Sequence, residues 1–232
     1  MELSPEKREK PEIFENPGTP GKPEDRPDTD PIAALLELVT TSPRFLGVEG
    51  LYYCDQIGRV AVRAGLKVPP RPSLEDIVTR RGTDPFSTDG AADPIWCPLP
   101  GEHDLVPVSE LREALCAALF EADGTPRTGL ASDGASEQLT AAALEYGLAP
   151  ALTPDGVVTV LSTRVDLAGR LASKLVPAAM SLVADGLMLR LRRCSDPWCR
   201  APFLDRTRNG IAASCSRTCS ERARKRRQRW AA

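Results

Sequence analysis

Four of the seven cysteines in this 232-residue chain lie between positions 194 and 219. They form two close pairs, Cys194 with Cys199 and Cys215 with Cys219. Thiolates in such pairs are the usual ligands of a tetrahedral structural zinc ion, which they bind at about 2.3 Å. The spacing therefore predicts one structural Zn²⁺ held by these four side chains.

Two disulfides are the main alternative to a metal site. The N-terminal residues MELSPEKREKPEIFENPG lack the apolar stretch of a secretion signal, so we expect a cytoplasmic protein, associated with the nucleoid. Thiols stay reduced in that compartment, which favours a metal over disulfides. A redox switch or an iron–sulfur cluster would also use four clustered thiols.

The residues around the cysteines predict how each pair is positioned. Ser-Asp-Pro-Trp between Cys194 and Cys199 suits a tight turn. Cys215 and Cys219 are four apart, so a helix capped by Ser214 would place both sulfurs on one face. Asn209-Gly210 between the pairs is a strong hairpin signal. Turn, hairpin and helix in this order predict a treble-clef-like zinc finger.

Positive charge is concentrated at the same end of the chain. Residues 190–232 contain 12 arginines and one lysine against three acids, a net charge of +10, whereas the other residues carry 17 basic and 29 acidic side chains, a net charge of -12. A zinc-anchored basic helix suits DNA phosphates and a major groove. We therefore expect a DNA-binding regulator whose nucleic-acid contacts are Arg206, Arg208, Arg217, Arg222, Arg224, Lys225, Arg226, Arg227 and Arg229.

Two other binding functions fit this charge. The finger could be a protein-interaction module that docks an acidic partner or the acidic remainder of the chain. It could also bind RNA or other nucleic acid without sequence preference, although aromatic content is only 5% and no stacking platform is visible. An enzyme is not expected, because His103 is the only histidine and no nucleophile or phosphate-binding motif is present.

The remainder of the chain predicts a mainly helical domain. We expect a disordered tail at 1–30, a helical domain at 31–189 and the finger at 190–232, which together give an α+β, mainly helical fold. Asp30-Pro31 marks the first ordered element, whose apolar run suits either a buried helix or a buried strand. Periodicity and caps predict helices at 48–65, 73–81, 108–124 and 135–147. A fifth helix is expected after Thr163, which would cap it with Asp166 at the third helical position. A loop is expected at 82–106 and a β-hairpin at 150–162.

Three further features complete the sequence-level description. No run of 18 apolar residues is present, so no membrane-spanning helix is expected. Cys116 lies in an apolar helix and is predicted to be a core residue, whereas Cys54 and Cys97 have no assigned role. The oligomeric state is open, with a homodimer among the options.

The C-terminal residues resemble the CGNR zinc-finger family of bacterial transcription regulators. The resemblance rests on RLRRCSDPWCRAPFLDRTRNG followed by CSRTCSERARKRR, and the helices and hairpin before them resemble the regulatory ABATE domain of that family. The resemblance implies one zinc, DNA binding, and an N-terminal domain that responds to a small-molecule or protein effector. The signature Cys-Gly-Asn-Arg is here Cys219-Ser220-Glu221-Arg222.

Overall fold

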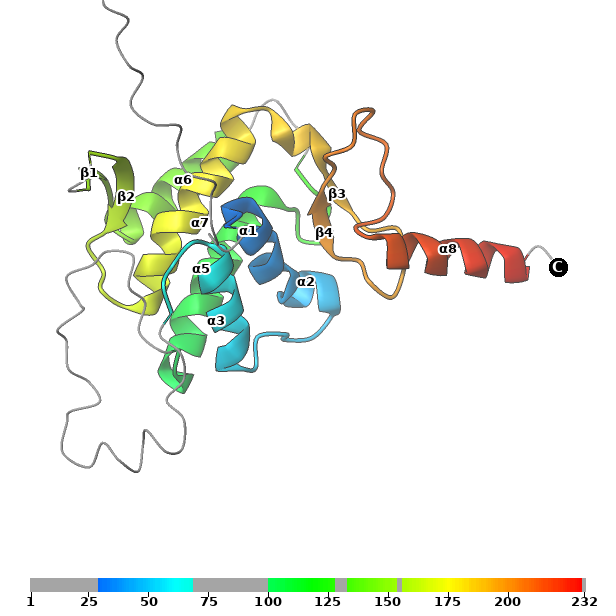
Figure 1. The fold of residues 1–232 in the computed structure, drawn as a ribbon, viewed down its shortest axis with the longest axis horizontal. Coiled ribbons are helices and arrows are strands. Elements are labelled where there is room, and N and C mark those ends of the chain that lie inside the picture. Colours follow the sequence, from blue (N-terminus) through cyan, green and yellow to red (C-terminus); the bar gives the residue numbers. More distant parts are fainter. Residues whose placement is uncertain (1–28, 69–99, 128–132, 154–155, 231–232) are drawn as a thin grey trace, which may run out of the picture.

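The computed structural model describes residues 29–68, 100–127, 133–153 and 156–230. The described chain is mainly helical with two small antiparallel hairpins, which confirms the predicted fold class (Figure 1). We call residues 31–189 the body and residues 190–230 the finger. The body contains α1 Pro31–Thr40, α2 Pro43–Leu46, α3 Cys54–Arg63, η1 Glu102–Asp104, α5 Leu105–Leu119, α6 Asp133–Glu145, β1 Leu148–Leu152, β2 Val158–Ser162 and α7 Leu167–Ala184. The 3-10 turn η2 Leu187–Arg190 leads into the finger, which contains β3 Leu191–Arg193, β4 Pro202–Leu204 and α8 Arg217–Trp230.

The first element, α1, is a helix and not a strand. Asp30 caps it, since its Oδ1 accepts a hydrogen bond from Ala33 N at 2.9 Å, and Pro31 occupies the first turn, where its missing N–H costs nothing. Five of the ten residues of α1 are buried, among them Leu35 and Leu38. A helix that is apolar nearly all round needs partners on several sides, and the surrounding helices supply them.

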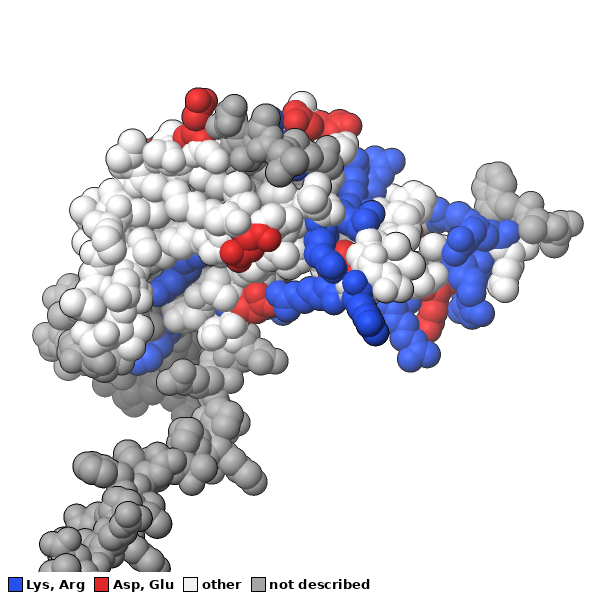
Figure 2. Space-filling model, turned by 90° about the horizontal axis from the view of Figure 1, so that it is seen from above, with Lys and Arg blue, Asp and Glu red and all other residues white. Residues whose placement is uncertain are grey.

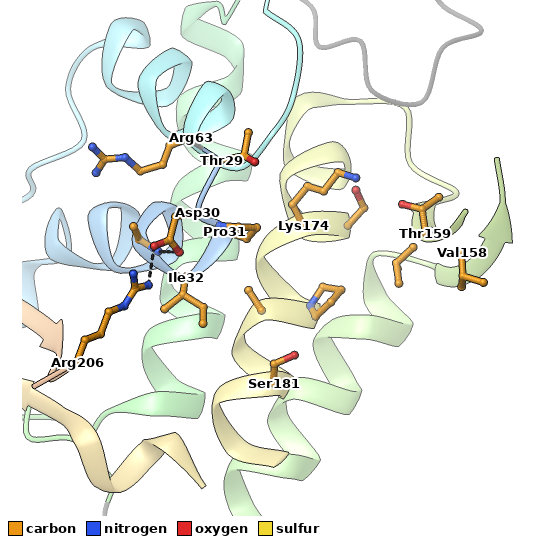
Figure 3. Close-up of a pocket in the computed structure, with 15 residues that line it drawn as sticks. Thr29, Asp30, Pro31, Ile32, Arg63, Val158, Thr159, Lys174, Ser181 and Arg206 are labelled. Atoms are coloured by element: carbon orange, nitrogen blue, oxygen red, sulfur yellow. Dashed lines mark hydrogen bonds and ion pairs between the residues drawn. The ribbon is translucent and has the colours of Figure 1, made fainter. Parts of the chain in front are cut away.

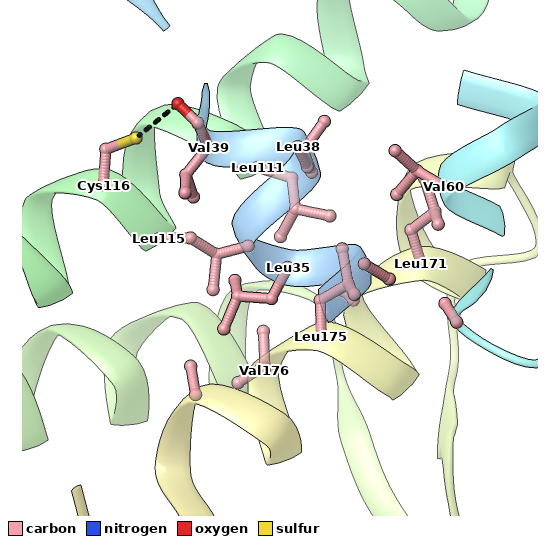
Figure 4. Close-up of a cluster of buried hydrophobic side chains, with 14 of the residues drawn as sticks. Leu35, Leu38, Val39, Val60, Leu111, Leu115, Cys116, Leu171, Leu175 and Val176 are labelled. Atoms are coloured by element: carbon pink, nitrogen blue, oxygen red, sulfur yellow. Dashed lines mark hydrogen bonds between the residues drawn. The ribbon is translucent and has the colours of Figure 1, made fainter. Parts of the chain in front are cut away.

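The hydrophobic core of the body is built around α1. Figure 4 shows leucine and valine side chains of α1, α5 and α7 meeting there, with Val60 of α3 closing one side. Cys116 is fully buried in this cluster, as predicted, and its thiol lies 3.9 Å from the carbonyl oxygen of Val39. The core therefore positions α7, whose C-terminal end leads into the finger.

The predicted helix over residues 48–65 begins later than expected. Only Cys54–Arg63 is helical, and Gly65 ends the turn with φ of +87°. Residues 48–53 are not helical, and Glu49 among them pairs with the buried Arg112 of α5, with Nη2 to Oε2 at 2.7 Å. A tertiary ion pair thus overrides the local helical pattern.

The boundaries of α5 also differ from the prediction. The predicted loop 82–106 is helical at its end, because η1 and the start of α5 cover Glu102–Val106. Positions 82–99 lie outside the described residues, as do the helix predicted at 73–81 and residues 1–28 of the predicted tail. The helix ends at Leu119 and not at Gly124, because Phe120 is extended and forms a β-bridge with Pro126. Phe120 also packs edge-on against Phe45, with ring centroids 5.1 Å apart.

The predicted β-hairpin is present, but the helix after it begins three residues later than the Thr163 cap implied. Strands β1 and β2 pair antiparallel, with Leu148 opposite Ser162. Thr163 continues this hairpin, because its N–H donates to Gly147 O at 3.1 Å. Asp166 is therefore the cap of α7 and not its third residue, with Oδ1 accepting from Gly169 N at 2.8 Å.

Helix α7 is the central helix of the body. By length and composition it is apolar enough to cross a membrane, although the sequence contains no uninterrupted apolar run of that length. In the structure 61% of it is buried, because it packs against α1, α5, α6 and β2. Its apolar character is thus explained by its place in the core.

The finger is seated on the body by apolar and polar contacts. Leu191 of β3 belongs to the core, and Leu204 of β4 packs against it. The Arg206 guanidinium pairs with Asp30 at 2.5 Å, and Arg193 Nη1 donates to Asp123 O at 2.9 Å. These contacts fix the base of the finger, while α8 projects away from the body (Figure 1).

Candidate metal centre and the adjoining basic helix

The four predicted thiols converge on one point. The Sγ atoms of Cys194, Cys199, Cys215 and Cys219 all lie within 4.8 Å of one another, and all four thiols are free. Cys199 Sγ lies 3.5 Å from Cys215 Sγ, which lies 3.6 Å from Cys219 Sγ. A tetrahedral zinc ion with bonds of about 2.3 Å separates its sulfurs by about 3.8 Å, whereas a disulfide needs about 2.05 Å. The cluster is therefore positioned to bind a metal ion, and its geometry suits zinc.

The first cysteine pair lies in the tight turn predicted from its sequence. The turn joins β3 to β4, and Cys194 N donates across its base to Ala201 O at 2.9 Å. Within it, the amides of Cys199 and Arg200 both donate to Asp196 O, at 2.9 and 3.1 Å. Arg200 adopts φ of +50°, which lets the chain reverse immediately after the second ligand.

The second pair is held differently from the prediction. Only Cys219 lies in α8, whereas Cys215 precedes the helix. Ser216, and not Ser214, provides the cap, because its Oγ accepts from Cys219 N at 3.3 Å. Ser214 instead lies against the first turn, with its Oγ 3.5 Å from that of Ser195. The helix starts late because Cys215 must reach back toward Cys199.

The chain between the two pairs is an ordered loop and not the predicted hairpin. A turn does form at Thr207–Gly210, where Gly210 has φ of +63°, but no strands flank it. The buried Asp205 carboxylate takes the amides that strands would have used: Oδ1 accepts from Thr207 N at 2.9 Å and Oδ2 from Ala212 N at 2.8 Å. Its bonds to Thr207, together with these backbone amides, lower the pKa of Asp205. The finger hairpin is β3–β4, on either side of the first pair.

A buried carboxylate links the first turn to α8. Asp196 is only 1% exposed, and its Oδ2 lies 2.9 Å from Arg222 Nε, without the alignment of a hydrogen bond. The same guanidinium donates through Nη2 to Cys219 Sγ at 3.2 Å. Arg222, predicted as a nucleic-acid contact, therefore spans Asp196 and a candidate metal ligand.

The protein environment affects the thiols unequally. Burial raises the pKa of Cys199 and Cys215. The Ser216 hydroxyl, together with the Arg222 guanidinium, lowers the pKa of Cys219 to about 7. A bound cation would favour the thiolate form of all of them, because its charge offsets both burial and mutual repulsion.

The other predicted basic residues occupy different environments. Arg217 pairs with Glu221 at 2.9 Å, Arg206 pairs with Asp30, and Arg208 is exposed on the loop. Five cations of α8 make no ion pair with any residue that the structure describes: Arg224, Lys225, Arg226, Arg227 and Arg229. Figure 2 shows blue side chains gathered over the finger and α8, beside a body surface that is mainly uncharged in this view.

An exposed tryptophan beside these cations was not assigned a role from the sequence. Trp198 is 79% exposed, and the Arg226 guanidinium lies 5.7 Å from its ring centroid. The turn between Cys194 and Cys199 is too short to bury an indole. The sequence signal that could have indicated this exposed ring is the aromatic residue between two closely spaced cysteines.

Two other residues have simpler placements. His103 is 84% exposed and lies 3.5 Å from Asp104, so it is a surface residue. Cys54 lies at the start of α3 and is not part of the cysteine cluster, and Cys97 lies outside the described residues.

The chain matches no protein-family model and no curated protein. The resemblance to the CGNR family therefore stays a prediction that rests on the residues quoted for it. Independently of any family, the finger carries a four-cysteine cluster suited to a metal ion.

Proposed function

We propose that this protein is a zinc-stabilised DNA-binding protein that regulates transcription, as the CGNR resemblance implies. The observation that carries the proposal is the position of α8. Its first turn contains Cys219, and its distal part presents five cations without ion pairs to the described residues. A metal ion would fix the start of this helix and leave its length free to contact phosphates.

The charge of α8 sets the strength of the expected effect. Each phosphate neutralised on duplex DNA contributes about -0.9 to the slope of log K against log salt concentration. If these five cations each neutralise one phosphate, the slope is about -4.5. Arg217 and Arg222 are expected to add less, because Glu221 and Asp196 already neutralise part of their charge.

The experiment measures DNA binding by the zinc-loaded full-length protein at a series of salt concentrations. The fluorescence anisotropy of a labelled duplex reports the binding. We expect binding at low salt, a slope near the value above, and loss of binding after zinc removal. A slope near zero, or full binding by the metal-free protein, would contradict the proposal. Sequence preference is tested separately with a randomised duplex pool, because phosphate contacts alone carry no sequence information.

Single-stranded nucleic acid is a second candidate, favoured by Trp198. Exposed aromatic rings beside arginines are the usual stacking surfaces for unpaired bases. If this candidate is correct, a single-stranded oligonucleotide binds more tightly than the duplex, and Trp198→Ala weakens it by about 1–3 kcal/mol. The same substitution would leave duplex affinity nearly unchanged if DNA phosphates are the target.

The proposal extends to the body as the regulatory part of a cytoplasmic, non-enzymatic protein.

Docking of α8 onto the acidic body, one form of the interaction-module alternative, gains no support from the described residues. The ion pairs of α8 there involve only Glu221 and Asp196, both in the finger. Docking to a separate acidic protein is tested by the same anisotropy assay, with an acidic peptide as competitor.

A further inference from the structure

The body contains an open pocket of about 940 Å³, and none of the four clustered cysteines lines it. Its walls are the start of α1, the middle of α7 and strand β2, with Arg63 at the end of α3 and Arg206 of the finger at its edge (Figure 3). The volume lies in the range of sites for small organic ligands.

One side chain in this pocket lacks an explained role. Lys174 projects from α7 into the region between α1 and β2 (Figure 3). It makes no ion pair with the residues that the structure describes, and burial alone lowers the pKa of its ammonium group. The two other cations of the lining are already paired: Arg63 with Glu37 at 2.7 Å, and Arg206 with Asp30. Lys174 is thus a half-buried positive charge without a counterion among the described residues.

The surroundings of Lys174 are mostly apolar. Ile32, Val158, Val160 and Pro177 contribute hydrocarbon surface, and Thr159 contributes a hydroxyl. A half-buried ammonium ion among such groups is stabilised by an anion, and the apolar walls favour an anion that carries a hydrocarbon body.

The start of α1 does not itself supply an anion site. Pro31 has no N–H, and Ala33 N already donates to the Asp30 carboxylate. The Asp30 carboxylate would also repel an anion placed against this helix end. The attraction in the pocket therefore comes from Lys174.

We propose that this pocket binds a small organic anion, with a carboxylate or phosphate group on Lys174 and an apolar body against Ile32, Val158 and Pro177. None of the residues that line the pocket belongs to the cysteine cluster, and anion binding there can be measured without nucleic acid. It supplies a chemical class for the effector that a regulatory body would require.

The direct test is isothermal titration calorimetry of the full-length zinc-loaded protein with matched pairs of probes. Benzoate and hexanoate are compared with their neutral amides, and phenyl phosphate distinguishes a phosphate site from a carboxylate site. We expect the anions to bind at least about tenfold more tightly than the amides, since one charged hydrogen bond supplies that factor.

Substitutions at Lys174 assign the preference to this side chain. Lys174→Met keeps the length of the side chain and removes its charge, so it should abolish the preference for anions, whereas Lys174→Arg should keep it. Lys67→Met, an exposed lysine outside the pocket, is the matched control. Thermal unfolding of each variant checks that the body is intact. Equal affinity for acids and amides, unchanged binding by Lys174→Met, or failure of every probe to bind would each overturn the proposal.

A consequence for the finger rests on the proposed function. The Asp30–Arg206 pair borders the same pocket and joins α1 to the finger, so the charge of an anion held by Lys174 acts on both members of this pair. We expect the best anionic probe to change DNA affinity in the wild-type protein and not in Arg206→Gln. If DNA binding itself is absent, calorimetry still decides whether the pocket binds anions, so the two proposals fail separately.

Discussion

Replacing Cys215 by serine removes one of the four candidate metal ligands and tests what holds the finger together. The finger has little else to stabilise it. Strands β3 and β4 have three residues each, and a two-stranded hairpin is marginal by itself. Helix α8 has 14 residues, which is near the lower limit for an isolated helix, and beyond its first turn most of it is exposed. We therefore expect the finger fold to depend on the metal.

The size of the effect follows from the ligand set. Structural zinc contributes about 10–16 kcal/mol in zinc-finger peptides, so each of four thiolates accounts for about 2.5–4 kcal/mol. Cys215→Ser should therefore weaken zinc binding by a few hundredfold. Loss of α8 would remove about one sixth of the α-helical residues in the described chain, while the core around α1 stays folded.

Zinc content after purification, competition with a chromophoric chelator and far-UV circular dichroism together measure these effects. Cys54→Ser is the matched control, because Cys54 lies outside the cluster. Wild type and Cys54→Ser should hold one zinc per chain, and Cys215→Ser should lose it to the chelator. Metal-free wild-type protein, or a Cys215→Ser variant with wild-type zinc affinity, would refute the assignment. Unchanged circular dichroism after zinc loss would refute the dependence of α8 on the metal.

Three further predictions concern stability and binding. Arg112→Ala should destabilise the protein by an amount at the lower end of about 3–5 kcal/mol in urea unfolding, because Arg112 is buried while Glu49 keeps part of its contact with water. Arg112 lowers the pKa of Glu49 from 4.5 to about 2. The pair therefore contributes fully to the free energy of unfolding above pH 4.5, and this contribution is lost as the pH falls toward 2. If the stability of Arg112→Ala fell equally steeply with pH over this range, the reasoning would be contradicted. Asp30→Ala should cost about 1 kcal/mol through loss of the α1 cap, whereas Asp30→Ser keeps the cap and loses only the pair to Arg206, so equal thermal stability of the two variants would argue against the cap. Arg224→Gln should reduce the magnitude of the salt slope of DNA binding by about 0.9, and an unchanged slope would exclude a phosphate contact at that position.

Local sequence signals were sufficient to predict helix starts that depend only on contacts between residues close together in the sequence. Asp30-Pro31 predicted the start of α1 because a capping carboxylate and a proline act within one helical turn. The same local reasoning failed at Thr163, because that residue is still bonded to Gly147 at the end of the hairpin. It also failed over residues 48–53, where the ion pair between Glu49 and Arg112 joins positions 63 apart. Contacts of this separation leave no trace in local periodicity.

The finger shows the same division. Cysteine spacing by itself determined which four thiols meet, because two close pairs can satisfy one tetrahedral ion with short connections. Only the tertiary structure decided how they meet. Asp205 takes the amides of the intervening loop, so the predicted Asn-Gly hairpin does not form, and Cys215 leaves the helix to reach Cys199.

Composition likewise determined the charge of α8 but not its availability. Every arginine counts equally in the sequence, whereas the structure pairs Arg206, Arg217 and Arg222 with acids and, among the described residues, leaves the distal part of the helix unpaired. The isolated charge of Lys174 was equally invisible in the sequence, since its environment comes from α1, β2 and α7 together. Electrostatic energy depends on distance and solvent access, and both are fixed only when the chain has folded.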